Sequence, residues 1–181
     1  MRLFCLFLFF FAPWALASSA TDKVIELYQN KEYERACLEG ARIARDNRAD
    51  ETFLNAYGFA CLNSDYIDFA ALAGIYLRNT PGSRQNASYI LTVALQKKLL
   101  YQSLADGVDL GDTHLPDTPH ILSKVFNAYA AGKYEKRSDG SYYIDLDGDP
   151  VLLDAIVENS RFKVRIRRLS GTRVVAEHLY W

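Results

Sequence analysis

The sequence predicts a mainly α-helical protein, in which antiparallel helical hairpins are followed by a small α+β C-terminal region with a terminal β-hairpin. From Val24 to Leu104, apolar residues recur at spacings of three and four, as in helices that bury one face. Two stretches of this region resemble each other at a spacing of 33 or 34 residues, and the last fifty residues change to β-type patterns. We therefore expect a helical-repeat domain over 18–132 and a small α+β region over 133–181.

The first seventeen residues have the composition of an export signal. Arg2 precedes fifteen positions that are apolar apart from Pro13, and small residues follow. This run is shorter than the roughly 20 residues that span a bilayer comfortably. We expect residues 1–17 to be a signal peptide cleaved after Ala17, or else before Thr21, with an uncleaved N-terminal anchor as the alternative. We therefore predict a periplasmic protein without a membrane span after signal removal.

The composition of the remaining chain is that of a globular domain. Half of the residues of the full chain, the predicted signal included, are hydrophobic, and low-complexity tracts are absent. Removal of Arg2 leaves 20 basic against 22 acidic residues, a formal charge of −2. This balance argues against nucleic-acid binding, which depends on a strong basic excess.

Polar and Pro/Gly clusters divide the helical region at 46–50, 63–65 and 79–82. The apolar positions between these breaks include Phe53, Leu54, Tyr57, Gly58, Cys61 and Leu62, then Tyr66, Phe69, Ala70, Ala73, Gly74 and Leu77, then Ile90, Leu91, Ala94 and Leu95. Small residues also recur every four positions, at Ala36, Gly40 and Ala44 and at Ala70 and Gly74. We expect short antiparallel helices that approach one another closely at these small residues.

An internal repeat lies within this region. The stretch 30–36 aligns with 63–70, at a spacing of 33 for the tyrosines and 34 for the alanines. The matching residues are Tyr33 and Ala36 in the first unit and Gly58, Tyr66, Ala70 and Pro81 in the second. This pattern resembles the tetratricopeptide repeat, over about residues 21–105. The resemblance implies stacked αα-hairpins, although the first unit lacks the helix glycine and the final proline, and an irregular helical bundle is the alternative.

Cys37 and Cys61 are the two cysteines beyond the predicted signal. The position midway between them in the sequence is 49, inside the turn at 46–50. In an antiparallel hairpin, residues equally far from the turn face each other, so the two cysteines are expected to lie side by side. In an oxidising compartment we predict a disulfide between them. The alternatives are two buried thiols and a metal or redox pair, but the spacing is far from CxxC and no nearby His completes a zinc set.

Residues 106–120 have the composition of a loop. They include four aspartates, two glycines, two prolines and two histidines. A candidate set of divalent-cation ligands among them is Asp106, Asp109, Asp112 and His114, because carboxylates and imidazole bind such cations. Their spacing matches no established site, and Asp and Gly are typical turn residues. We therefore predict turns here and no metal site, followed by a helix that Thr118 caps and Pro119 begins.

The C-terminal region is rich in β-forming residues. Segments 142–146 and 162–169 predict strands, and Ser170-Gly171 predicts the turn into a final strand over 172–181. Between them, Asp149-Pro150 predicts the cap of a short helix through 151–156.

The aspartates at 145, 147 and 149 partly match a calcium-binding loop. The sixth position of that loop requires Gly and the twelfth requires Glu, but this sequence has Pro150 and Ile156 there. We therefore expect no calcium site.

Charges are segregated in this region. Residues 139–158 carry six acids and no base, whereas 159–173 carry six bases and no acid. The bases are Arg161, Lys163, Arg165, Arg167, Arg168 and Arg173. Because several of them alternate with apolar residues, one strand face is expected to be cationic and is a candidate anion-binding surface. The alternatives are neutralisation by the acidic half and protection of an edge strand.

Motifs of catalysis are absent from the sequence. It has no nucleophile elbow, HExxH motif or glycine-rich phosphate loop, so we predict no enzymatic activity and no cofactor. Stacked helical hairpins form surfaces suited to a peptide or protein partner, which favours an exported protein-interaction adaptor of the cell envelope. Two alternatives are a module that binds anions or envelope polymers through the cationic hairpin, and a metal-dependent enzyme that uses the acidic loop.

Overall fold

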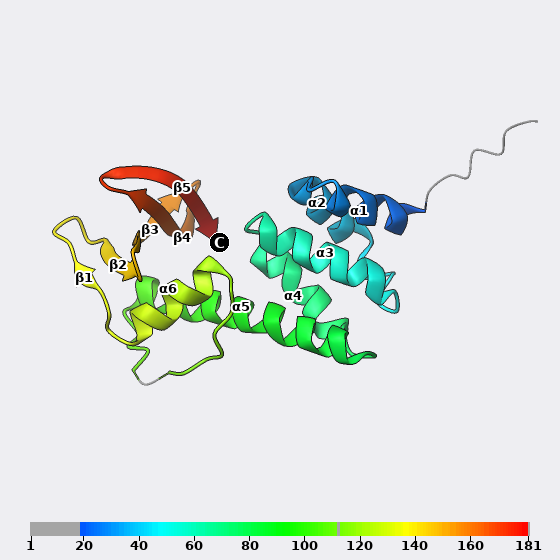
Figure 1. Cartoon of the computed structure of the whole chain (residues 1–181), viewed down its shortest axis with the longest axis horizontal. Helices are drawn as coiled ribbons and strands as arrows, with labels where there is room; N and C mark the ends of the chain where they lie inside the picture. Colours follow the sequence, from blue (N-terminus) through cyan, green and yellow to red (C-terminus); the bar gives the residue numbers. More distant parts are fainter. Residues whose placement is uncertain (1–18, 112, 181) are drawn as a thin grey trace, which may run out of the picture.

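The computed structural model describes residues 19–111 and 113–180, and the predicted signal peptide lies outside them. Within these residues, six helices form hairpins and a five-stranded antiparallel sheet follows, which confirms the predicted fold class (Figure 1). The elements are α1 (Ala20–Gln29), α2 (Tyr33–Ile43), α3 (Glu51–Asn63), α4 (Ile67–Tyr76), α5 (Pro81–Asp106), α6 (Ile121–Ala130), β1 (Glu135–Lys136), β2 (Tyr142–Leu146), β3 (Asp149–Glu158), β4 (Arg161–Ser170) and β5 (Arg173–Tyr180). None of the helices in this part of the chain combines the length and apolarity needed to cross a membrane.

The α1–α2 and α3–α4 hairpins have turns with the same backbone structure. Lys31 and Asp65 adopt left-handed φ angles of 61° and 65°, and in each turn the next amide donates to the carbonyl five residues earlier. Corresponding positions of the two hairpins are therefore 34 residues apart, which is also the spacing of the buried Ala36 and Ala70. Tyr33 is the first residue of α2, whereas Tyr66 precedes α4 as its N-cap, which accounts for the shorter spacing of the tyrosines.

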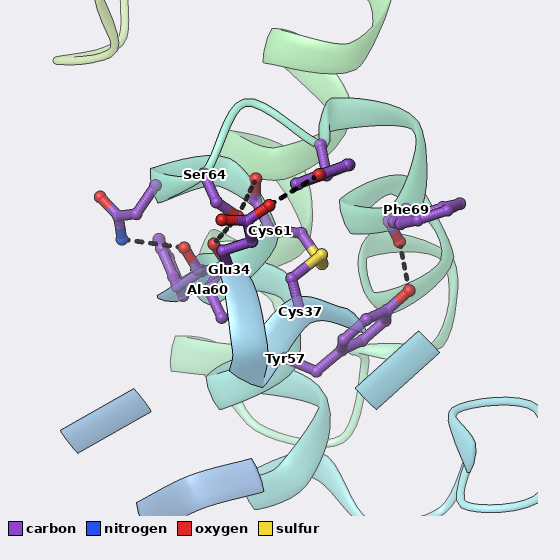
Figure 2. The surroundings of a disulfide bond; sticks show 10 residues. Glu34, Cys37, Tyr57, Ala60, Cys61, Ser64 and Phe69 are labelled. Carbon is purple, nitrogen blue, oxygen red and sulfur yellow. Dashed lines mark hydrogen bonds between the residues drawn. A yellow bond between two sulfur atoms is a disulfide. The ribbon is translucent and has the colours of Figure 1, made fainter. Parts of the chain in front are cut away.

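A disulfide joins α2 to α3, as the spacing of the cysteines predicted (Figure 2). The Sγ atoms of Cys37 and Cys61 are 2.08 Å apart, and both residues are fully buried. One turn before Cys61 on α3, the Tyr57 hydroxyl donates to the carbonyl of Phe69 in α4 at 2.9 Å. Helix α3 is therefore fixed covalently to one neighbour and by a hydrogen bond to the other.

Glycines allow these helices to pack closely. A Cβ atom on Gly40 of α2 would lie 2.4 Å from Cδ2 of Tyr57, and one on Gly74 of α4 would lie 2.9 Å from Cγ of Leu91. Real Cβ atoms do not approach other heavy atoms so closely, so a side chain at either position would require Tyr57, Leu91 or the helices themselves to shift.

Helix α5 connects the helical hairpins to the sheet (Figure 1). It begins with Thr80 as N-cap and Pro81 in its first turn, and it ends at Gly107, which has a left-handed φ of 70°. Helix α4 packs against α5 as far along as Lys97 and Lys98, and the last turns of α5 contact α6 and β4 through Ser103 and Tyr101. Both regions of the protein therefore depend on the same long helix.

The start of α6 differs from the prediction. Helix α6 begins at Ile121, and His120 is its N-cap, so the expected cap at Thr118 is wrong. The Nδ1 atom of His120 accepts a hydrogen bond from the Leu122 amide at 3.2 Å. The Thr118 hydroxyl accepts a hydrogen bond from the His120 amide at 3.3 Å, so it lies before the helix, and the imidazole satisfies an amide of its first turn.

The five strands are connected in sequence order, each antiparallel to the next. The predicted β4–β5 hairpin is confirmed, but the short helix predicted over 151–156 is wrong, because these residues belong to β3. Asp147 and Gly148 form a tight turn with positive φ angles, which pairs β3 with β2. Strand β3 is central in the sheet, and its residues 151–153 are all buried, so its pattern lacks the alternation of a half-exposed strand.

Candidate functional site

Exposed apolar side chains gather where α4 packs against α5. Ile75 is 60% exposed, Leu91 is 39% exposed and Leu95 is 47% exposed. We call these three residues the α4–α5 apolar strip. Leu91 and Leu95 share one face of α5, because residues four apart are neighbours on a helix surface.

Two contacts fix the position of Ile75 relative to the leucines. At one end of the helix pair, the Asp68 carboxylate lies 2.9 Å from Nζ of Lys98. Ile75 follows Asp68 by two helical turns, and Leu91 precedes Lys98 by two turns, so in this antiparallel pair Ile75 lies beside Leu91. The close approach of Gly74 to Leu91 agrees with this register.

The strip could not be recognised from the sequence. Leu91 and Leu95 belong to the same apolar pattern as Ile90, which is fully buried. Periodicity identifies an apolar face, but it does not show how much of that face the neighbouring helix covers. Contiguous exposed apolar side chains are typical of interaction sites.

A groove with a volume of about 500 Å³ lies between α5 and the start of β4. We call it the α5–β4 groove. Tyr101 and Phe162 line it, and their rings meet edge to face with centroids 4.8 Å apart. Lys97, Lys98 and Arg161 also line it, so the groove combines an aromatic wall with cationic side chains.

Lys97 is an unusual member of this groove, because its side chain is only 1% exposed. Its Nζ atom lies 2.9 Å from Oδ2 of Asp68, the oxygen that Lys98 also contacts. Burial lowers the pKa of Lys97, and the neighbouring Asp68 carboxylate opposes this effect. A charged side chain is therefore held at a fixed place beside the aromatic wall.

Carboxylates of β3 lie opposite most of the predicted anion-binding residues. Asp154 accepts two hydrogen bonds from Arg165, at 2.8 and 2.7 Å, and one from Arg167 at 2.7 Å. The hydrogen bond with Asp154 raises the pKa of Arg165 above its usual value. The other pairs are Lys163 with Glu158 and Arg168 with Asp149.

The two remaining candidates lie at opposite ends of the β4–β5 hairpin. Arg173 is exposed at the start of β5, and Arg161 is at the start of β4, in the α5–β4 groove. The acidic and basic halves of the C-terminal region thus face each other across neighbouring strands. Among the predicted anion-binding residues, Arg161 lies in the α5–β4 groove together with Lys97 and Lys98 of α5.

The acidic segments form turns in the structure. Asp109 accepts a hydrogen bond from the Gly111 amide at 2.9 Å, and Asp145 accepts one from the Gly148 amide at 2.7 Å. Asp112 lies outside the described residues. Across 19–111 and 113–180, no group of three or more His, Cys, Asp or Glu side chains is arranged to hold a metal ion.

A hydrogen bond between Asp65 and His178 connects the α3–α4 turn to β5. Nδ1 of His178 lies 3.0 Å from Oδ1 of Asp65, and this contact raises the pKa of His178 despite its partial burial. The fully buried Tyr180 lies near His178 and near His120, with ring centroids 6.2 and 6.3 Å apart. Burial lowers the pKa of His120. Because 113 residues separate Asp65 from His178, no sequence signal could have joined them.

These features define an αα-hairpin protein with a C-terminal antiparallel sheet, an exposed apolar strip and a cationic groove. No protein-family model matches the sequence, and no similar curated protein or solved structure was found. The resemblance to the tetratricopeptide repeat therefore stays a prediction, and the 34-residue spacing of the two hairpins is the observation that supports it.

Proposed function

We propose that this protein is an interaction adaptor that binds an apolar face of a partner protein through the α4–α5 apolar strip. The exposure of Ile75, Leu91 and Leu95 on two adjacent helices is the observation that carries this proposal. Burial of the exposed parts of three such side chains contributes on the order of 2–4 kcal/mol to association. The strip therefore supplies the apolar centre of an interface, and polar contacts around it add specificity.

The scaffold beneath the strip supports this function. Helix α4 is held to α3 by the Tyr57 hydrogen bond and to α5 by close packing at Gly74, so the strip is presented on rigid elements. A preformed surface binds with a smaller loss of conformational entropy than a mobile one.

We also propose that the adaptor acts outside the cytoplasm, in the periplasm of a cell envelope. The Cys37–Cys61 disulfide supports this location, because such bonds persist in oxidising compartments. The apolar composition of residues 1–17 supports export.

Photo-crosslinking in living cells tests the proposed interface. A photoreactive amino acid at Leu95 should give a discrete adduct with a second protein. The same amino acid at Lys23, an exposed position on α1, is the matched control and should not give this adduct. Ile75→Glu or Leu91→Glu should abolish the adduct, since either change places a charge inside the strip.

Two outcomes would contradict the proposal. Adducts of equal yield from Leu95 and Lys23 would show that the strip has no special role. Crosslinking of the chain only to a second copy of itself would assign the strip to self-association instead of adaptor function.

A further inference from the structure

We propose that the partner of the α4–α5 apolar strip is an amphipathic helical segment that carries acidic side chains at one end of its apolar stripe. These acidic side chains lie against three exposed arginines where α4 ends and α5 begins. The inference rests on the adaptor function proposed above and names the chemistry of the partner. The three residues are Arg48, Arg78 and Arg84, and we call them the arginine cluster.

The arginine cluster draws on three segments that meet at the C-terminal end of α4. Arg78 lies in the loop after α4, and Arg84 lies in the first turn of α5. Nη1 of Arg84 donates to the carbonyls of Arg78 and Asn79, at 2.9 and 3.2 Å. The guanidinium carbon of Arg48, from the α2–α3 turn, lies 5.4 Å from the ring centroid of Tyr76, the last residue of α4. Because Tyr76 directly follows the isoleucine of the strip, the cluster is adjacent to the strip.

The charges of this cluster have no carboxylate partner within residues 19–111 and 113–180. None of the three arginines forms an ion pair there. The contacts of Arg84 are with carbonyl groups, and Arg48 contacts a carbonyl and a tyrosine. Neutral partners leave the positive charge in place, so the cluster favours an anionic group on whatever covers it.

The carboxylate of Glu51 is close to this cluster but is already used. It accepts hydrogen bonds from the amides of Arg78 and Asn79 and from the Ser83 hydroxyl, each at 2.7 Å. These hydrogen bonds lower the pKa of Glu51. The preceding Asp50 accepts from the third amide of α3 as its N-cap. Both carboxylates therefore serve free amides at helix ends, where negative charge is favourable.

The position of the cluster sets the spacing expected in the partner. At the opposite end of the strip, Lys98 is paired with Asp68 at 2.9 Å. Arg84 precedes Leu91 by seven residues, which is two helical turns or about 10 Å along α5. We therefore expect the acidic side chains of the partner about two turns away from the apolar side chain that contacts Leu91.

A helix with acidic residues at one end matches both parts of this surface. Leu91 and Leu95 are one turn apart, so a helix lying along α5 can place apolar residues of the same spacing against them. Its carboxylates can form charge-assisted, bidentate hydrogen bonds with the arginines. A basic helix would bring like charges together, and an uncharged one would leave the arginines without an anionic partner.

Fluorescence anisotropy with three synthetic helical peptides tests this proposal on the full chain. The first peptide has a leucine stripe, with glutamates about two turns before the leucines. The second has lysines in place of the glutamates, and the third has serines in place of the leucines. We expect saturable binding of the glutamate peptide, at least about tenfold tighter than that of either of the others.

Charge reversal in the protein gives a sharper arm. Arg78→Glu combined with Arg84→Glu should reverse the preference, so that the lysine peptide binds more tightly than the glutamate peptide. Arg78→Glu alone leaves the loop contacts of Arg84 in place and should weaken the glutamate peptide severalfold. Arg173→Glu is the matched control, because it reverses an exposed arginine on β5, and it should leave all affinities unchanged.

The proposal fails if the glutamate peptide does not bind saturably, if it binds no more tightly than the lysine peptide, or if the double variant keeps the preference of the natural chain. Equal affinities for the leucine and serine peptides would leave only a patch that binds anions and would overturn the role of the strip.

The photo-crosslink at Leu95 separates this proposal from the adaptor function. An adduct of equal yield from the natural chain and from the Arg78/Arg84 double variant would keep the adaptor and overturn the acidic partner. Absence of the adduct from the natural chain would instead overturn the adaptor function itself. We expect the adduct from the natural chain and its loss in the double variant.

Discussion

Reduction of the Cys37–Cys61 disulfide should destabilise the protein strongly. The two cysteines are 24 residues apart, and a cross-link that closes a loop of this length removes chain entropy from the unfolded state. By the loop-entropy relation this is worth about 3.5 kcal/mol at 25 °C. Because domains are stable by about 5–15 kcal/mol in total, loss of the bond removes a large part of that free energy.

Urea unfolding of the oxidised and reduced protein, followed by circular dichroism, measures this difference. With an m-value of about 2 kcal/mol/M, the midpoint should fall by nearly 2 M on reduction. The variant with Cys37→Ala and Cys61→Ala is the control, since its midpoint should not respond to the reductant. Coincident curves for oxidised and reduced protein, or peptide maps without a Cys37–Cys61 link, would refute the reasoning.

Two further predictions concern packing and pH. Gly40→Ala should lower the free energy of unfolding by about 1–3 kcal/mol, because its Cβ would collide with Tyr57, whereas Gly82→Ala, with its nearest neighbouring atom at 3.9 Å, should be neutral or stabilising in urea unfolding. The raised pKa of His178 gives stability that is fully present below about pH 6.5 and is lost as the pH rises through the folded-state pKa. Asp65→Asn should therefore destabilise more at pH 5.5 than at pH 8.5, and an equal loss at both would show that no protonated His178 depends on this carboxylate. Asn tolerates the left-handed backbone of Asp65, so the turn itself is retained.

The helical hairpins and their cross-link could be predicted because they depend on local patterns. Apolar spacing placed the helices, and the polar cluster at 46–50 placed the turn between α2 and α3. The midpoint of Cys37 and Cys61 falls in that turn, which predicted the disulfide. The small residues at Gly40 and Gly74 indicated close packing, and both contact a large side chain of the next helix. Each of these signals lies within one hairpin or one helix face.

Strand β3 was mispredicted because its burial depends on its neighbours. Val151, Leu152, Ala155 and Ile156 have spacings that also fit a helix. Their position in the centre of the sheet follows from pairing with β2 on one side and β4 on the other. Those pairings are tertiary contacts, which local periodicity does not contain.

The candidate sites depend still more on tertiary structure. The groove unites Lys97 and Lys98 with Arg161 and Phe162, more than 60 residues later in the chain. The segregation of acidic and basic residues in the C-terminal region was visible in the sequence. In the structure these charges form ion pairs between β3 and β4, such as those of Asp154 with Arg165 and Arg167.

The central claim is that the α4–α5 apolar strip becomes buried against a partner protein. Hydroxyl-radical footprinting with mass spectrometry, on the chain alone and in its isolated complex, tests this most directly. We predict that oxidation of Ile75, Leu91 and Leu95 falls severalfold in the complex, while that of Val175, which is 50% exposed on β5, stays the same. Unchanged oxidation of all three strip residues in a stable complex would contradict the account.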